Sequence, residues 1–148
     1  MQALATPANL SDPDLVRWVK RPFAVMADAP PGGTNAQWRD PTTAWVAPDD
    51  QLGPDSYWAA VGAQQQCVGG AALYASGDFV NWKYRGLLFS QASLGEGSCA
   101  SRANASACDQ FSSCPMNECP DVFTLGGNVT VIKYSDQVGG CPSIAVEQ

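Results

Sequence analysis

Two carboxylates stand in matching contexts of the sequence, each shortly before a proline and an apolar stretch. Asp40 directly precedes Pro41, and Glu118 lies two residues before Pro120. If the stretches that follow are strands of neighbouring sheets, the two carboxylates lie at the same end of those sheets. Paired carboxylates around one pocket are what the acid–base hydrolysis of a glycosidic bond requires. The alternative is that both residues occupy ordinary turns, where Asp-Pro is common.

The absence of histidine further limits the catalytic and metal-binding groups that the chain can contain. The chain has 148 residues, no histidine and a formal net charge of -6. These facts exclude Ser-His-Asp and Cys-His catalytic groups and every His-ligated metal site, and no cofactor or metal is implied. No basic run is present to neutralise phosphates, so a nucleic-acid partner is not expected. The length allows one domain or part of a larger one.

The elements that would position the two carboxylates are predicted to be β-strands. Alternating segments rich in aromatic and β-branched residues predict strands at 42–47, 57–63, 71–75 and 83–89, with turns at 48–55 and 76–78. Such a run of short antiparallel strands is typical of one blade of a β-propeller. A meander in a β-sandwich is the alternative.

The segment 91–116 differs in kind, because it is small, polar and carries three of the six cysteines. We predict a Cys-rich surface loop insertion, pinned by a disulfide. Strands resume at 122–125 and 129–134, joined by a hairpin turn at 126–128, and these begin another blade. No convincing amphipathic helix is present, and a turn or two of helix at 15–20 is confined by Pro13 and Pro22.

The cysteines indicate an oxidising compartment. No CxxC occurs, so disulfides are a better use for most of the cysteines than a metal site. Glycosylation acceptor patterns at Asn9, Asn104 and Asn128 agree with a secreted protein. The first 22 residues lack the apolar core of a signal peptide. The longest charge-free stretch, 56–77, contains Gln and Gly residues that favour strands over a membrane span.

Four stretches together resemble one enzyme family. The sequence WRDPTTAW at 38–45 resembles the "RDP" motif of glycoside hydrolase family 32, the invertases and fructan hydrolases, and MNECPDVF at 116–123 resembles its "EC" motif. The stretches SDPDLVRWVK at 11–20 and AALYASGDFVNW at 71–82 look like two further segments of that family. The ordered matches cover about residues 2 to 126.

The resemblance implies an all-β fold, part of a five-bladed β-propeller, and a site that cleaves terminal β-D-fructofuranosides of sucrose or fructans. Glu118 matches the general acid/base of the family, and Asp40 matches the transition-state stabiliser that holds fructose hydroxyls. Arg39 and Asn117 are the further substrate-binding candidates. Cys119 lies beside the acid/base, where a thiol in place of a charged group would help to keep Glu118 protonated. A cell-wall or vacuolar location would fit the cysteines.

Two departures from the family pattern matter. Asn117 stands where the family usually has Trp, and the "NDPNG" stretch that carries the family's nucleophile is absent. A retaining glycosidase needs a second carboxylate to attack the anomeric carbon. We therefore expect residues 1–148 to be a partial propeller domain, roughly blade two and the start of blade three. The N-terminal blade and the C-terminal β-sandwich would be missing, and the fragment alone would be inactive.

Two other kinds of protein remain open from the sequence. One is a sugar-binding or inhibitor-like homologue that has lost catalysis, and the other is a small disulfide-stapled secreted module. Within the enzyme class, the motifs do not separate hydrolase from fructosyltransferase or sucrose from fructan, and they assign no oligomeric state. We expect one disulfide among Cys99, Cys108 and Cys114, and a free Cys119. The tryptophans at 38, 45, 58 and 82 are predicted to be blade core.

Overall fold

A computed structural model of the chain describes residues 1–46, 57–65, 68–90, 116–125, 129–136 and 142–147. These residues form strands and turns, with no helix among them. No helix in this part of the chain could span a membrane. The predicted turn at 48–55, most of the loop at 91–116 with its three cysteines, and the hairpin connection at 126–128 lie outside the described residues.

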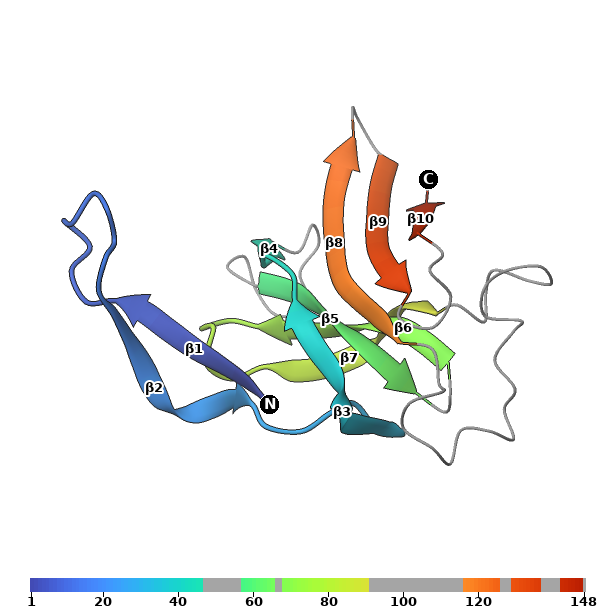
Figure 1. Ribbon diagram of the computed structural model, residues 1–148, viewed down its shortest axis with the longest axis horizontal. Coiled ribbons are helices and arrows are strands. Elements are labelled where there is room, and N and C mark those ends of the chain that lie inside the picture. Colours follow the sequence, from blue (N-terminus) through green and yellow to red (C-terminus); the bar gives the residue numbers. More distant parts are fainter. Residues whose placement is uncertain (47–56, 66–67, 91–115, 126–128, 137–141, 148) are drawn as a thin grey trace.

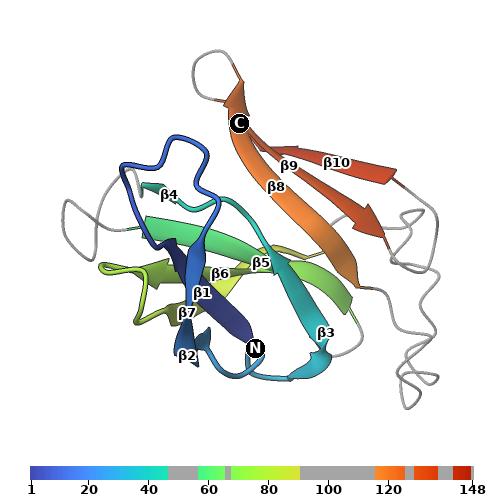
Figure 2. The same cartoon turned by 60° about the vertical axis from the view of Figure 1, so that its left-hand side comes forward.

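The strands form three antiparallel sheets (Figures 1 and 2). They are β1 (Gln2–Pro7), β2 (Trp18–Met26), β3 (Gly33–Pro41), β4 (Trp45–Val46), β5 (Tyr57–Gln65), β6 (Val68–Ser76), β7 (Lys83–Ser90), β8 (Asn117–Leu125), β9 (Val129–Asp136) and β10 (Pro142–Glu147). The first sheet is the hairpin β1–β2. The second has the order β3-β5-β6-β7, with β4 also paired to β5, and the third has the order β10-β9-β8.

Most of the predicted strands are confirmed. The predictions at 57–63, 71–75, 83–89 and 129–134 lie within β5, β6, β7 and β9, and the prediction at 122–125 is the second half of β8. The second sheet therefore contains the predicted blade, built by consecutive antiparallel strands.

One strand prediction was wrong, and one possible helical turn does not form. The strand expected at 42–47 lies earlier in the sequence, because β3, which pairs with β5, ends at Pro41. Only the short β4, which also pairs with β5, lies in the expected range. The sequence showed no convincing helix, and the short helical turn that 15–20 could have made does not form, because Trp18 begins β2 and pairs with Pro7 of β1. In both places strand pairing with a neighbour outweighs the local signal.

One face of the second sheet packs toward the hairpin that precedes it. Val61 and Ala63 of β5 are fully buried on this face, together with Trp38 of β3 and Tyr74 of β6. Met26, the last residue of β2, joins the same cluster. Complete burial of a side chain such as Val61 contributes about 1.5–3 kcal/mol relative to an exposed one.

The other face of the same sheet packs against the third sheet. Ala60 of β5 and Phe89 of β7 contact Ile132 and Tyr134 of β9, and the Phe89 and Tyr134 rings lie 5.0 Å apart. Because side chains alternate along a strand, β5 supplies both clusters and is buried on both faces. Successive sheets that stack face to face in chain order are what a propeller requires.

Three of the four tryptophans predicted to be blade core lie in or against these clusters. Trp38 is 2% exposed, and Trp82 packs against the same cluster. Trp45 packs against the second cluster, and its ring contacts that of Trp58 edge to face at 6.5 Å.

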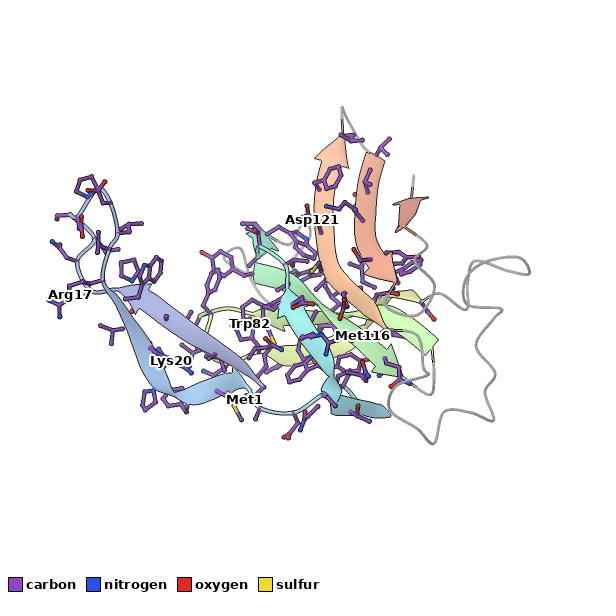
Figure 3. The ribbon with its side chains drawn as sticks, in the orientation of Figure 1. Met1, Arg17, Lys20, Trp82, Met116 and Asp121 are labelled. Atoms are coloured by element: carbon purple, nitrogen blue, oxygen red, sulfur yellow. The ribbon has the colours of Figure 1, made fainter. Side chains whose placement is uncertain are left out.

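The hairpin β1–β2 projects away from the other sheets, and Arg17 lies at its far end (Figure 3). Large apolar side chains remain exposed along it, among them Trp18, Val19 and Phe23. The connection Ala8–Arg17 is closed by a hydrogen bond from the Ala8 N–H to the Arg17 carbonyl of 2.8 Å.

Candidate active site

An arginine from one sheet and a glutamate from the next meet across 79 residues of sequence. Arg39, near the end of β3, donates from Nε to Oε1 of Glu118 at 3.1 Å, and its Nη2 donates to the same oxygen. Its Nη1 donates to the Ala36 carbonyl at 3.0 Å. All three nitrogens of the guanidinium are therefore held, which fixes the direction of the side chain.

A second contact joins the neighbouring residues of the same two strands. The backbone N–H of Cys119 donates to Oδ2 of Asp40 at 3.3 Å, and its thiol lies 3.8 Å from the same oxygen. That carboxylate oxygen is also 4.0 Å from Nε of Arg39. The structure thus brings together four of the five predicted site residues, Arg39, Asp40, Glu118 and Cys119, in one cluster.

Both strands carry a β-bulge at the residues that form the cluster. In β3, Arg39 pairs with Gly62 and Pro41 pairs with Val61, so that Asp40 is an extra residue. In β8, the pairing shifts by one residue between Glu118 and Asp121. A bulge interrupts the alternation of side chains and re-aims them, which lets consecutive residues face the same site.

The two bulges have the same backbone conformation. Asp40 has φ 59° and Cys119 has φ 48°, both in the left-handed region. Neither residue is a glycine, and a backbone of this kind costs about 1–3 kcal/mol at each position. Strain of this kind persists only where surrounding contacts hold it, and here the Asp40–Cys119 hydrogen bond joins the two strained residues directly.

The carboxylates are accessible to a ligand. The side chains of Arg39, Asp40 and Glu118 are 39%, 36% and 31% exposed, respectively. The cluster therefore lies at the surface where the second and third sheets meet.

Cys119 is a free thiol, as predicted. Desolvation, and next the negative charge of Asp40, raise the pKa of this thiol. The negative charge of Glu118 raises the pKa further, and the positive charge of Lys133 lowers it. Its closest carboxylate contact is with Asp40. The role predicted for it, which is to keep Glu118 protonated, stays a prediction.

Asn117 differs from the other predicted site residues, because its side chain is fully buried. Its Oδ1 and Nδ2 have no hydrogen-bond partner among the described residues. The preceding Met116, at the end of the predicted loop, is also fully buried. A contact between Asn117 and a sugar stays a prediction, and the structure places this side chain in the interior behind the cluster.

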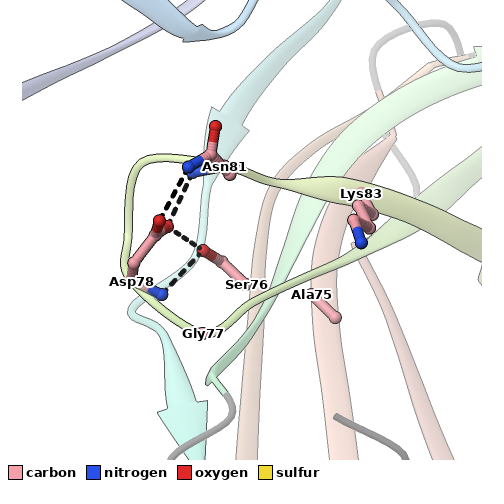
Figure 4. Close-up of a pocket in the computed structure, with 6 residues that line it drawn as sticks. All are labelled: Ala75, Ser76, Gly77, Asp78, Asn81 and Lys83. Carbon is pink, nitrogen blue, oxygen red and sulfur yellow. Dashed lines mark hydrogen bonds between the residues drawn. The ribbon is translucent and has the colours of Figure 1, made fainter.

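A separate hollow of about 250 Å³ lies at the turn between β6 and β7, lined by Ala75, Ser76, Gly77, Asp78, Asn81 and Lys83 (Figure 4). The Asp78 carboxylate accepts hydrogen bonds from the N–H groups of Val80 and Asn81, from Nδ2 of Asn81 and from Oγ of Ser76. The backbone bonds from Asn81 and Val80 hold the pKa of Asp78 well below its ordinary value. This carboxylate organises its own turn, and the hollow shares no residue with the cluster.

Sequence reasoning missed two parts of the arrangement. The Ala36 carbonyl orients Arg39, and a backbone acceptor leaves no signal in residue types. Gly62, which pairs with Arg39, was a detectable signal, because a glycine inside a buried strand often marks a close approach of another backbone. Among the described residues, no group of carboxylates and thiols is arranged to hold a metal ion.

Comparison with known proteins gives a consistent result. Residues 1–144 match the sequence model of the "Glycosyl hydrolases family 32 N-terminal domain". A fructan 1-exohydrolase of Triticum aestivum is 42% identical over 83 residues, which are 55% of this chain and 13% of that protein.

Two solved structures resemble the fold. Fructan 1-exohydrolase IIa of Cichorium intybus superimposes with a TM-score of 0.70 at 30% identity, over 97% of this chain and 25% of that one. A β-fructofuranosidase of Bombyx mori gives a TM-score of 0.54 at 26% identity, over 82% of this chain and 20% of that one. The chain thus spans about a quarter or less of each of these proteins.

Proposed function

Because the chain belongs to glycoside hydrolase family 32 and its sheets are part of that family's five-bladed β-propeller, we propose that it carries part of the active site of a β-fructofuranosidase-type enzyme. The reaction would release terminal β-D-fructofuranosyl groups. The observation that carries the proposal is the cluster of Arg39, Asp40, Glu118 and Cys119, which joins two strands at matched bulges.

We propose Glu118 as the general acid/base. Both hydrogen bonds from Arg39 reach Oε1, so Oε2 is the oxygen that we assign to proton transfer. The acid form would protonate the departing glycosidic oxygen, and the resulting carboxylate would then take a proton from the attacking water. Arg39 would hold the carboxyl group in one orientation during both steps.

We propose Asp40 as the residue that binds hydroxyl groups of the fructosyl ring. An exposed carboxylate with two acceptor oxygens can accept hydrogen bonds from neighbouring hydroxyls, and these strengthen as the ring gains positive charge. The N–H of Cys119 occupies Oδ2 and fixes the group. The proposal assigns no nucleophile to this chain, because the sequence contains no NDPNG stretch.

The substrate class follows from the relatives. The Cichorium intybus enzyme has been solved in complex with 1-kestose, and the Bombyx mori enzyme in complex with sucrose. Both sugars end in a fructosyl group. We therefore propose sucrose or short fructans as substrates of the full-length protein.

The test of this function is the variant Glu118→Gln in the full-length protein, assayed on sucrose and 1-kestose. The amide keeps the shape of the side chain and cannot deliver a proton, so we expect kcat to fall by about 10²–10⁴-fold with the unfolding temperature unchanged. Asp28→Asn is the matched control, because Asp28 is exposed and lies in the β2–β3 connection. Wild-type turnover by Glu118→Gln would remove Glu118 from the reaction.

A further inference from the structure

Gly62 lies in β5, next to both strands that carry the cluster, β3 and β8. It pairs with Arg39 of β3 on one side of β5 and with Ala71 of β6 on the other. The third sheet reaches it too, because a Cβ atom built on Gly62 would lie 2.2 Å from the backbone oxygen of Asn117 in β8. The Arg39 oxygen would be 3.1 Å from the same atom. The backbone on either side of the Arg39–Glu118 ion pair therefore packs against this one glycine.

The space at Gly62 is too small for any side chain. Real Cβ atoms essentially never come within 3.0 Å of another heavy atom, and the obstacle here is backbone, which cannot turn aside as a flexible side chain can. A methyl group at this position would force β8 away from β5 by about 0.8 Å or more, since the 2.2 Å contact must open to at least 3.0 Å. Because Asn117 immediately precedes Glu118, the displacement would begin one residue from the carboxyl group of the cluster.

We propose that Gly62 is a positioning residue, whose missing side chain sets the spacing between the two sheets and so places Glu118 against Arg39 and Cys119 against Asp40. Its role as a determinant of catalysis rests on the function proposed above. Its role in setting the spacing is independent of that function, because the contacts among these side chains exist whatever reaction they serve.

Two other glycines serve as controls that distinguish a specific effect on the cluster from a general effect of crowding in a sheet. A Cβ on Gly70 would lie 2.7 Å from the Phe89 oxygen, a milder backbone clash that is still below 3.0 Å, lies inside the second sheet and involves none of the cluster residues. A Cβ on Gly77 would meet nothing within 4 Å. Gly70→Ala is thus the control for a crowded sheet, and Gly77→Ala is the control for the substitution itself.

Alkylation of Cys119 reports the spacing without any assay of sugar hydrolysis. The thiol is exposed and free, and its contact with Asp40 joins β8 to β3. The experiment treats the native full-length protein with iodoacetamide at neutral pH and follows the peptide that contains Cys119 by mass spectrometry. Loss of the Asp40 contact removes a negative neighbour from the thiol, so more thiolate forms and alkylation becomes faster.

We expect Gly62→Ala to raise the alkylation rate of Cys119 severalfold, and Gly70→Ala and Gly77→Ala to leave it at the wild-type value. An unchanged rate in Gly62→Ala, or an equal rise in Gly70→Ala, overturns the proposal. Loss of folding in Gly62→Ala while Gly70→Ala folds also overturns it, because Gly62 would then be a requirement of folding.

Hydrolysis is the second measurement, and it separates this proposal from the proposed function. A misplacement of about 1 Å can cost on the order of 100-fold in rate, so we expect kcat for 1-kestose to fall about that far in Gly62→Ala with a smaller change in KM. If the wild-type protein hydrolyses no fructoside, the proposed function fails and the alkylation result still decides the role of Gly62. If the wild type is active and Gly62→Ala is equally active, the positioning role fails alone.

Discussion

Arg39 is the residue on which the geometry of the cluster depends most. Its guanidinium makes two hydrogen bonds to one oxygen of Glu118 and one to the Ala36 carbonyl, so its three nitrogens hold two partners at once. An ammonium group is a point charge on a flexible chain and cannot reproduce this fork. The Arg39 side chain is 39% exposed, so its ion pair with Glu118 contributes little to the free energy of unfolding.

We expect Arg39→Lys to reduce kcat/KM by roughly 10–100-fold, the loss that one or two hydrogen bonds to a charged group correspond to. The unfolding temperature should change little, because the pair is partly exposed. Steady-state kinetics on 1-kestose and thermal unfolding measure the two effects separately. Arg21→Lys is the matched control, because Arg21 lies on β2 over the Phe23 ring. Wild-type kcat/KM in Arg39→Lys would show that a simple positive charge is sufficient.

At the scale of residues, the sequence identified most of the cluster. Matching the two motifs predicted that Asp40 and Glu118 lie together, and the structure brings their strands into contact with Arg39 between the carboxylates. The burial of Asn117 could not be predicted, since a polar residue beside an acid/base suggests a solvent-facing position. Its backbone packs on Gly62 of the neighbouring sheet, and how two sheets stack leaves no signal in the local sequence.

At the scale of elements, the strands of the second sheet were predictable where apolar residues run together, as in β5, or alternate with polar ones, as in β7. β3 was not, because its sequence GTNAQWRDP is polar for most of its length and its position at the end of the sheet order requires only one paired partner. The bulges were not predictable either. Their positions follow from the register between strands, which local sequence does not encode.

The turn between β6 and β7 gives an element-scale expectation. Asp78 accepts its hydrogen bonds as a carboxylate, and its pKa is lowered in the folded state by the N–H groups of Asn81 and Val80. A group with a lowered folded pKa stabilises the fold above its unfolded pKa of about 3.9, and this contribution is lost as the pH falls through the folded pKa.

We therefore expect Asp78→Ala to lower the free energy of unfolding at pH 7, and the difference from wild type to shrink progressively below about pH 4. Urea unfolding at pH 7 and at pH 3 measures both values. Asp28→Ala is the control, because Asp28 is an exposed aspartate outside this turn. A difference that stays constant between the two pH values would show that the ionised carboxylate contributes nothing beyond its shape.

At the scale of the whole molecule, the sheets stack in chain order with a buried cluster on each face of the middle one. This arrangement makes the cluster possible, since Asp40 and Glu118 belong to different sheets and meet only because those sheets are neighbours. The sequence predicted a blade and the start of another, and the family match together with the likeness to a solved structure of the family excludes the alternative of a β-sandwich meander. The packing angle between sheets depends on side chains distant in sequence and could not be derived from local patterns.

We propose that Asp40 and Glu118 bind one fructosyl group between them. The most direct measurement is a crystal structure of the full-length Glu118→Gln protein soaked with 1-kestose. We expect ring hydroxyls of the terminal fructosyl group within hydrogen-bond distance of the Asp40 carboxylate, and the glycosidic oxygen beside the side chain at position 118. A fructosyl group bound elsewhere on the protein, with Asp40 free of contact, would contradict the account.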